Sequence, residues 1–83
     1  MIYPLDYGFL AGTTGGDGNA VDVWLGSEPG RRLDAVVCTV DLMKNDVEVK
    51  LLLGCTDAEK QTILRFHNSG PQSAVLIERE IPF

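Results

Sequence analysis

The sequence predicts a mainly β domain with about five strands and one short α-helix, arranged as a small barrel or a strongly curled sheet. Short apolar segments rich in β-branched residues alternate with glycine and proline turns, and one segment carries a helix-start signature. The 83 residues, of which 45% are hydrophobic, allow one domain with a thin core. We therefore expect a single domain over residues 1–83 that draws part of its stability from a partner subunit or a bound metal.

The first half of the chain predicts two strands joined by a glycine-rich loop. Residues 3–10 are aromatic and apolar, with Pro4 suited to a strand start or an edge. Residues 12–18 contain four glycines and two threonines, which is typical of a loop with unusual backbone angles or close ligand approach. Residues 21–25 alternate with a period of two, so Asp22 should point away from the side that carries the valines.

The middle of the chain predicts a β-hairpin. After turn chemistry at residues 27–30, residues 33–43 indicate a long, mostly buried strand. The turn at residues 44–46 leads into a second arm over residues 47–54. On this arm Val47, Val49 and two leucines share one face, and the charged residues share the other: Asp46, Glu48 and Lys50.

A helix and a last strand complete the expected elements. Thr56 and Glu59 form a capping-box pattern, which predicts a helix that runs to about Asn68 and ends before Gly70 and Pro71. His67 would then lie at the helix end as a cation that interacts favourably with the helix dipole. Residues 73–81 regain β-branched and apolar character and predict the final strand.

Composition excludes several classes of function. Twelve acidic residues against seven basic ones give a net charge of −5, and only Arg31 and Arg32 are adjacent, so we expect no nucleic-acid partner. No segment resembles a signal peptide or a membrane span, so we expect no membrane association and a cytoplasmic location. Cys38 and Cys55 lie in apolar sequence and are interpreted as buried thiols, the alternative being a disulfide.

The stretch GGDGNAVDVWLG at residues 15–26 brings Asp17, Asn19 and Asp22 close together. Such oxygen ligands suit Mg²⁺, which needs one or two carboxylates and keeps several waters. The alternative is a polar turn whose side chains bond local backbone amides, with Asp22 a solvated strand residue. For Glu48 and Lys50 the alternative is an exposed ion pair that contributes about 0–1 kcal/mol.

The motifs YPLDYGF at residues 3–9 and DGNAVDV at residues 17–23 resemble the hallmarks of the soluble, magnesium-dependent inorganic pyrophosphatases, YPxNYG(Y/F)(I/L) and DGDPxDV. The hairpin LMKNDVEVKL, residues 42–51, is similar to the next segment of that family. The resemblance covers residues 3–54 well and the helix loosely. It implies a five-stranded barrel of the oligonucleotide-binding (OB) type over residues 1–83, and Mg²⁺-dependent hydrolysis of diphosphate to phosphate.

The resemblance also implies roles for individual residues. Asp17, Asp22 and Glu48 match metal-binding carboxylates, and Asn19 is a further candidate ligand through its amide oxygen. Asp22, Lys50 and Tyr7 are the candidate catalytic residues, with Lys50 at a phosphate-binding position and Tyr7 at the pocket wall. The cofactor would be Mg²⁺, with Mn²⁺ as the alternative, and diphosphate or phosphate would bind through the metal.

The sequence departs from the family pattern at important positions. Asn19 replaces the aspartate credited with accepting the proton of the attacking water, and an amide cannot accept that proton. The family's Tyr-Lys pair after the helix is replaced by Ser69 and Gly70, and Asp46 is only an insecure match to a further acid. We therefore expect a pyrophosphatase-like protein whose hydrolysis is weak or lost. The alternatives are an active enzyme completed by its oligomer, or a non-catalytic ligand-binding or structural barrel.

Two expectations concern assembly and topology. A thin core and an abrupt start at the YP motif favour a homo-oligomer. The tripeptide EIP at residues 80–82 resembles the family's first strand, so the last strand of this chain is predicted to take the place of that strand, as in a circular permutation. This hypothesis requires residues 73–82 to pair with strands of the first half.

Overall fold

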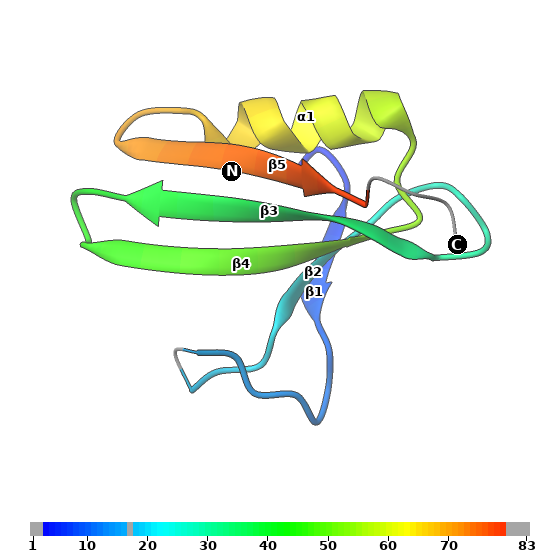
Figure 1. Ribbon diagram of the computed structural model, residues 1–83, viewed down its shortest axis with the longest axis horizontal. Coiled ribbons are helices and arrows are strands. Elements are labelled where there is room, and N and C mark those ends of the chain that lie inside the picture. Colours follow the sequence, from blue (N-terminus) through cyan, green and yellow to red (C-terminus); the bar gives the residue numbers. More distant parts are fainter. Residues whose placement is uncertain (1–2, 17, 80–83) are drawn as a thin grey trace.

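The computed structural model describes residues 3–16 and 18–79, which form five strands and one helix (Figure 1). Their types and order are those predicted from the sequence, although every strand except β4 is shorter than expected within the described residues. The elements are β1 (Asp6–Phe9), β2 (Asp22–Leu25), β3 (Leu33–Asp41), β4 (Asp46–Leu53), α1 (Asp57–His67) and β5 (Gln72–Glu78).

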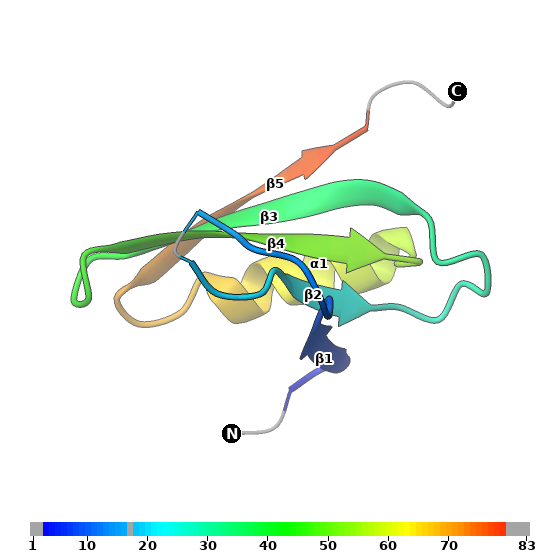
Figure 2. The same ribbon diagram turned by 90° about the horizontal axis from the view of Figure 1, so that it is seen from below.

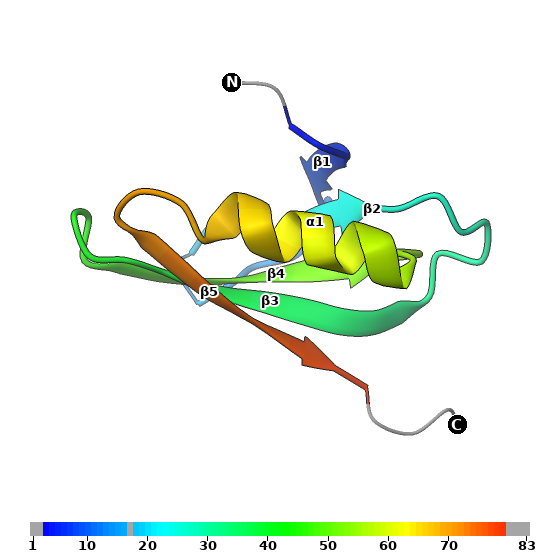
Figure 3. The ribbon, with the colours of Figure 1, turned by 90° about the horizontal axis from the view of Figure 1, so that it is seen from above.

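All five strands belong to one mixed sheet in the order β1-β2-β4-β3-β5. The β2–β4 pair is parallel and the other pairs are antiparallel. β1 and β5 lie at opposite edges, and within the described residues the sheet does not close between them (Figures 2 and 3). The mainly β fold with one helix is therefore confirmed, but the OB-type barrel is not, because closure needs hydrogen bonds between the two edge strands.

The predicted last strand pairs with the first half of the chain, since β5 lies antiparallel to β3. This meets the condition set for the circular permutation, which itself stays a prediction. The tripeptide at residues 80–82 lies outside the described residues.

The core lies between α1 and one face of the sheet. Trp24, Val37, Leu52 and Ile63 are completely buried there. Figure 3 shows α1 in front of β4 and β3, and Figure 2 shows it behind the sheet. One helix therefore covers one side of the sheet, which we call the inner face.

The valines of β4 do not point into this core. Lys50 and Leu52 occupy the inner face and are buried, whereas Val47 and Val49 are 67% and 52% exposed on the other side. The predicted division of β4 into an apolar and a charged face is correct, but the charged face is the one that turns inward. On β3 the prediction of a mostly buried strand holds for one face only, since Val40 is exposed and Val37 is buried.

The start of α1 is built as the capping box predicts. Thr56 Oγ1 accepts a hydrogen bond from the Glu59 amide at 3.2 Å, and Glu59 accepts one from the Thr56 amide at 2.8 Å. Glu59 also accepts from the amide of Ser27, which ties the helix to the end of β2. Gly26 is required at this junction because a Cβ there would collide with the carbonyl of Gly54 and with Cys55.

Both cysteines are free thiols, which excludes the disulfide alternative. Cys55 is buried as predicted, whereas Cys38 is only half-buried. In residues 3–16 and 18–79, no helix has the length and apolar character needed to cross a membrane.

Candidate functional site

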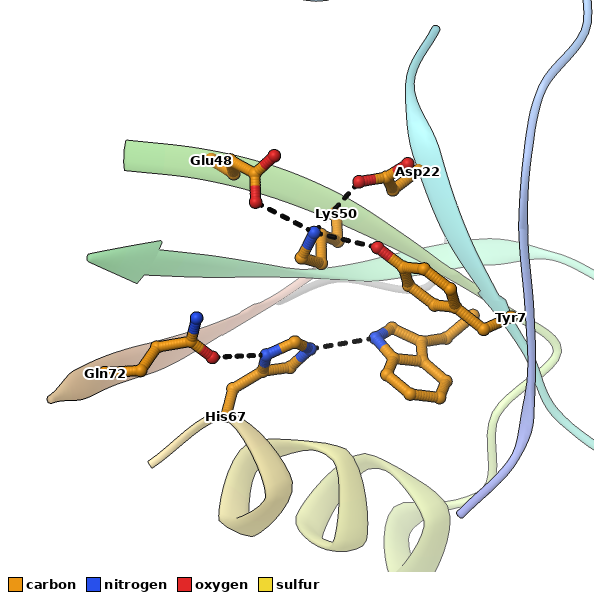
Figure 4. Close-up of polar contacts among 7 residues, drawn as sticks. Tyr7, Asp22, Glu48, Lys50, His67 and Gln72 are labelled. Atoms are coloured by element: carbon orange, nitrogen blue, oxygen red, sulfur yellow. Dashed lines mark hydrogen bonds and ion pairs between the residues drawn. The ribbon is translucent and has the colours of Figure 1, made fainter. Parts of the chain in front are cut away.

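Three strands bring four predicted site residues together on the inner face. Asp22 precedes Val23, Lys50 precedes Leu51, and these two apolar residues are partners in the parallel β2–β4 register. Tyr7 comes from β1, where it pairs with Trp24 of β2. Glu48 lies two residues before Lys50 and so shares its face. We call Tyr7, Asp22, Glu48 and Lys50 the Lys50 cluster (Figure 4).

Lys50 is the centre of this cluster. Its Nζ donates to the Tyr7 hydroxyl at 2.8 Å, to Asp22 Oδ2 at 2.9 Å and to Glu48 Oε2 at 3.1 Å (Figure 4). These bonds use all three N–H donors of an ammonium group. Lys50 is 5% exposed, whereas the side chains of Asp22 and Glu48 are 32% and 31% exposed. The alternative of an exposed Glu48–Lys50 ion pair is therefore wrong.

The cluster has a defined charge state. Burial alone would lower the pKa of Lys50, but its hydrogen bonds to Tyr7, Asp22 and Glu48 outweigh burial and raise it. Burial opposes ionisation of Asp22 as well, yet the hydrogen bonds from Lys50 and Tyr7 lower the pKa of that carboxyl. Burial raises the pKa of Tyr7. At neutral pH the cluster thus holds an ammonium, an ionised Asp22 and a neutral phenol.

A pocket of about 290 Å³ opens beside the carboxylates of this cluster. Gly15 and Gly16 of the β1–β2 loop form one wall, and Asp22 and Glu48 contribute the acidic groups. Because the glycines carry no side chains, the loop can approach a ligand closely. We call this the glycine-loop pocket.

The other side of the cluster faces a second, larger pocket of about 380 Å³. Tyr3, Tyr7 and Phe66 supply aromatic surface, and Lys50 and Glu48 line the same pocket. Glu48 therefore borders both pockets. We call the larger one the aromatic pocket.

His67 lines the aromatic pocket and is 5% exposed. Its Nε2 accepts the indole N–H of Trp24 at 3.1 Å, and its Nδ1 lies 2.8 Å from Gln72 Oε1 (Figure 4). An indole nitrogen can only donate, so the imidazole is neutral and Nδ1 carries the hydrogen that Gln72 accepts. Burial lowers the pKa of His67, in agreement with this state. The predicted cation at the helix end is therefore wrong.

Sequence reasoning missed this role of His67, although a signal was present. Lys60, Ile63 and His67 are spaced by three and four residues and are the buried residues of α1. This spacing marks one stripe of a helix, so His67 could have been placed on the inner stripe with Ile63.

Three further residues were predicted as ligands or possible ligands: Asp17, Asn19 and Asp46. Asp17 lies outside the described residues. Asn19 is exposed in the β1–β2 loop, where its backbone carbonyl accepts a hydrogen bond from the Gly15 amide at 2.7 Å. Asp46 is exposed at the first position of β4. Among the described residues no group of three or more metal-binding side chains lies together.

The cluster nevertheless fits a magnesium ion in one respect. Asp22 and Glu48 supply two carboxylates near one point, each about one-third exposed, and Mg²⁺ is commonly held by one or two carboxylates together with substrate phosphates. The ammonium of Lys50 already lies at that point and repels a second cation. Binding of an anion together with the cation offsets this repulsion.

Comparisons of this chain with models of known protein families, with curated proteins and with solved structures found no match. The pyrophosphatase resemblance therefore rests on the motifs alone.

Proposed function

We propose that this chain is a pyrophosphatase-like domain that binds diphosphate or phosphate together with a divalent cation and hydrolyses diphosphate slowly or not at all. The observation that carries the proposal is the convergence of Asp22 and Glu48 on Lys50, beside Tyr7 and next to a glycine-walled pocket. The OB-type barrel, the homo-oligomer and the cytoplasmic location remain predictions that accompany it.

Asp22 and Glu48 would hold the Mg²⁺, or Mn²⁺ in its place, and the resemblance adds Asp17 and Asn19 from the loop. When bound, the cation supplies charge neutralisation of the phosphate groups. Lys50 would donate to a phosphate oxygen, and the neutral Tyr7 hydroxyl would orient the Lys50 ammonium.

The hydrogen bonds of Lys50 couple the two ligands. Its three donors are already used, so a phosphate oxygen must replace the Tyr7 hydroxyl or one of the two carboxylates as an acceptor. When a divalent cation neutralises Asp22 and Glu48, these carboxylates no longer need the positive charge of Lys50. We therefore expect cation and anion to strengthen each other's binding, as reciprocal linkage requires.

Weak hydrolysis follows from the lack of a base in the cluster. Asp22 and Glu48 are both paired with Lys50, and the raised pKa of Tyr7 keeps its proton in place. Asn19 stands where the resembled family has its proton acceptor, and an amide cannot take that role.

A second candidate function is a non-catalytic ligand-binding domain. The aromatic pocket favours it, because about 380 Å³ lies within the range of small-molecule sites and its walls combine aromatic rings with Lys50. In that case a ligand binds without turnover, and its affinity does not depend on the cation.

Calorimetric titration with Mg²⁺ and phosphate, separately and together, tests the proposal. We expect each ligand to bind at least about 10-fold more tightly in the presence of the other. Asp22→Asn combined with Glu48→Gln should abolish cation binding, and Lys50→Met should weaken phosphate binding at least about 10-fold, the loss of one charged hydrogen bond. Asp57→Asn, which removes an exposed carboxylate on α1, is the matched control and should bind as the original chain does.

Phosphate release from diphosphate separates the two candidates. We expect slow or undetectable turnover in the original chain and a measurable gain in Asn19→Asp. Absence of any Mg²⁺-dependent phosphate or diphosphate binding would reject the first candidate. Cation-independent binding that Asp22→Asn leaves intact would favour the second.

A further inference from the structure

β5 forms one edge of the sheet in the described part of the chain, and its composition favours pairing with a further strand. Its sequence, QSAVLIE, contains no proline and no basic residue, and its ladder with β3 has no register shift. Val75 and Ile77 are 60% and 53% exposed. Its charged residue, Glu78, lies at the end of the strand and is paired with Lys60. The middle of β5 therefore lacks the charge, proline or bulge that commonly protects a sheet edge.

The ladder between β5 and β3 identifies which backbone groups of β5 point to the open edge. The amide of Arg79 donates to the carbonyl of Asp34 at 2.6 Å, so the backbone groups of Arg79 face β3. In an antiparallel pair, successive residues direct their backbone groups to opposite sides. The odd-numbered residues of β5 therefore bond to β3, and the outward groups are those of Ala74, Leu76 and Glu78.

The side chain of Asn68, the residue that follows α1, covers this edge at Ala74. Its Oδ1 accepts a hydrogen bond from the Ala74 amide at 2.9 Å, and its Nδ2 donates to the Ala74 carbonyl at 3.1 Å. Nδ2 also donates to the carbonyl of Leu64 at 3.1 Å, which anchors the side chain to the helix. Binding of both backbone groups of one residue by one partner is the pattern of a hydrogen-bonded pair in an antiparallel sheet. The Asn68 amide thus takes the place of a residue in a neighbouring strand.

We propose that Asn68 is a blocking residue, whose side chain keeps β5 from pairing with β5 of a second copy of this chain. In its absence, two copies align antiparallel with Leu76 opposite Leu76 about a two-fold axis, and Ala74 then lies opposite Glu78. Val75 of each copy lies beside Ile77 of the other, which adds an apolar cross-strand pair. The proposal is independent of the proposed function, because the bonds of Asn68 involve no member of the Lys50 cluster.

Amide hydrogen exchange, followed by NMR at low protein concentration, tests whether Asn68 covers the edge. The Ala74 amide should be protected in the original chain and should exchange at least about 10-fold faster in Asn68→Ala, which loses that hydrogen bond. The Val75 amide faces β3 and is the internal control, since a general loss of stability accelerates both amides. Ser69→Ala removes another bond at the helix end, from Ser69 Oγ to the Phe66 carbonyl, and should leave the Ala74 rate unchanged.

Sedimentation velocity over a range of protein concentrations tests the blocking itself. Asn68→Ala should form species larger than those of the original chain, in a share that rises with concentration. Adding Ala74→Pro should restore the original size, because proline has no amide to donate to an added strand and is tolerated at a sheet edge. Circular dichroism checks that each variant folds. If the double variant does not fold, Val75→Lys replaces Ala74→Pro, since lysine on an edge strand also opposes pairing.

Three results would overturn the proposal. The first is an Ala74 amide that exchanges equally fast, relative to Val75, in the original chain and in Asn68→Ala. The second is an Asn68→Ala variant with the size of the original chain at every concentration. The third is association of Asn68→Ala that persists when the folded second substitution is added, because the copies would then meet through another surface.

Discussion

Lys50 shows how a single residue decides the character of the site. A lysine at the fifth position of an alternating strand is ordinarily solvated, yet here it is 5% exposed and bonded to three oxygens. Those oxygens come from β1, β2 and β4, so the ammonium also joins three strands. The same residue therefore holds the sheet together locally and offers the positive charge that an anion needs.

His67 makes stability depend on pH. Its pKa is lowered in the folded protein because burial disfavours the cation, while the unfolded chain keeps a value near 6.5. Stability is thus fully present above about pH 6.5 and is lost as the pH falls toward the folded pKa, since the unfolded state takes up the proton first. The free energy of unfolding should fall by up to about 1.4 kcal/mol per pH unit from this residue.

Urea titrations between pH 7 and pH 5 check this expectation. His67→Gln is the matched variant, because a glutamine can accept from Trp24 and donate to Gln72 without titrating. Its stability should decline less steeply with falling pH than that of the original chain. Equal slopes for the two proteins would contradict a neutral His67.

Among the secondary-structure elements, α1 is linked to the sheet by the ion pairs of Lys60. Its Nζ donates to Glu78 of β5 at 3.0 Å and lies 3.5 Å from Asp34 Oδ1 of β3. That oxygen is buried and has no hydrogen-bond partner among the described residues, so the ammonium compensates its charge. α1 is thereby held across the two strands at the β5 edge, beyond which the described part of the chain adds no further strand.

Lys60→Met should lower the free energy of unfolding by about 1–2 kcal/mol, the lower part of the range for charged hydrogen bonds, because the Glu78 side chain is 49% exposed and partly screened. Lys44→Met removes an equal charge from the exposed turn and should change stability by less than about 0.5 kcal/mol. Chemical denaturation of the two variants side by side measures the difference. Similar losses in both would show that net charge, and not the contact, is responsible.

At the scale of the whole molecule, one core joins every element. Trp24 of β2 is completely buried and contacts the rings of Tyr7, Phe66 and His67, which come from β1 and α1. The same core cluster includes Val37 of β3 and Leu52 of β4, and Leu76 of β5 packs against it. We therefore expect cooperative unfolding without a populated intermediate.

Trp24 is the only tryptophan, so its fluorescence reports on the core directly. Urea transitions followed by tryptophan fluorescence and by far-ultraviolet circular dichroism should coincide in midpoint and slope. The measurement should be made at low protein concentration, where self-association does not contribute to the apparent stability. A fluorescence transition at lower urea would show that β1 and β2 separate before the hairpin melts.

Local signals in the sequence were enough to predict the types and order of the six described elements. Alternation along β2 and β4, the Thr56–Glu59 capping box and the turn before Asp46 each act within a few residues. The grouping of Glu48 with Lys50 on one strand face followed from the same alternation. The site was predictable to that extent.

Which face of each strand is buried depends on contacts between distant segments. Alternation divides β4 into two faces but does not say which one meets α1, and the helix covers Lys50 and leaves Val47 exposed. The neutral state of His67 depends on Trp24, 43 residues away, and the open edges depend on which strands pair. These features arise from contacts between distant segments, whose free energy no local pattern encodes.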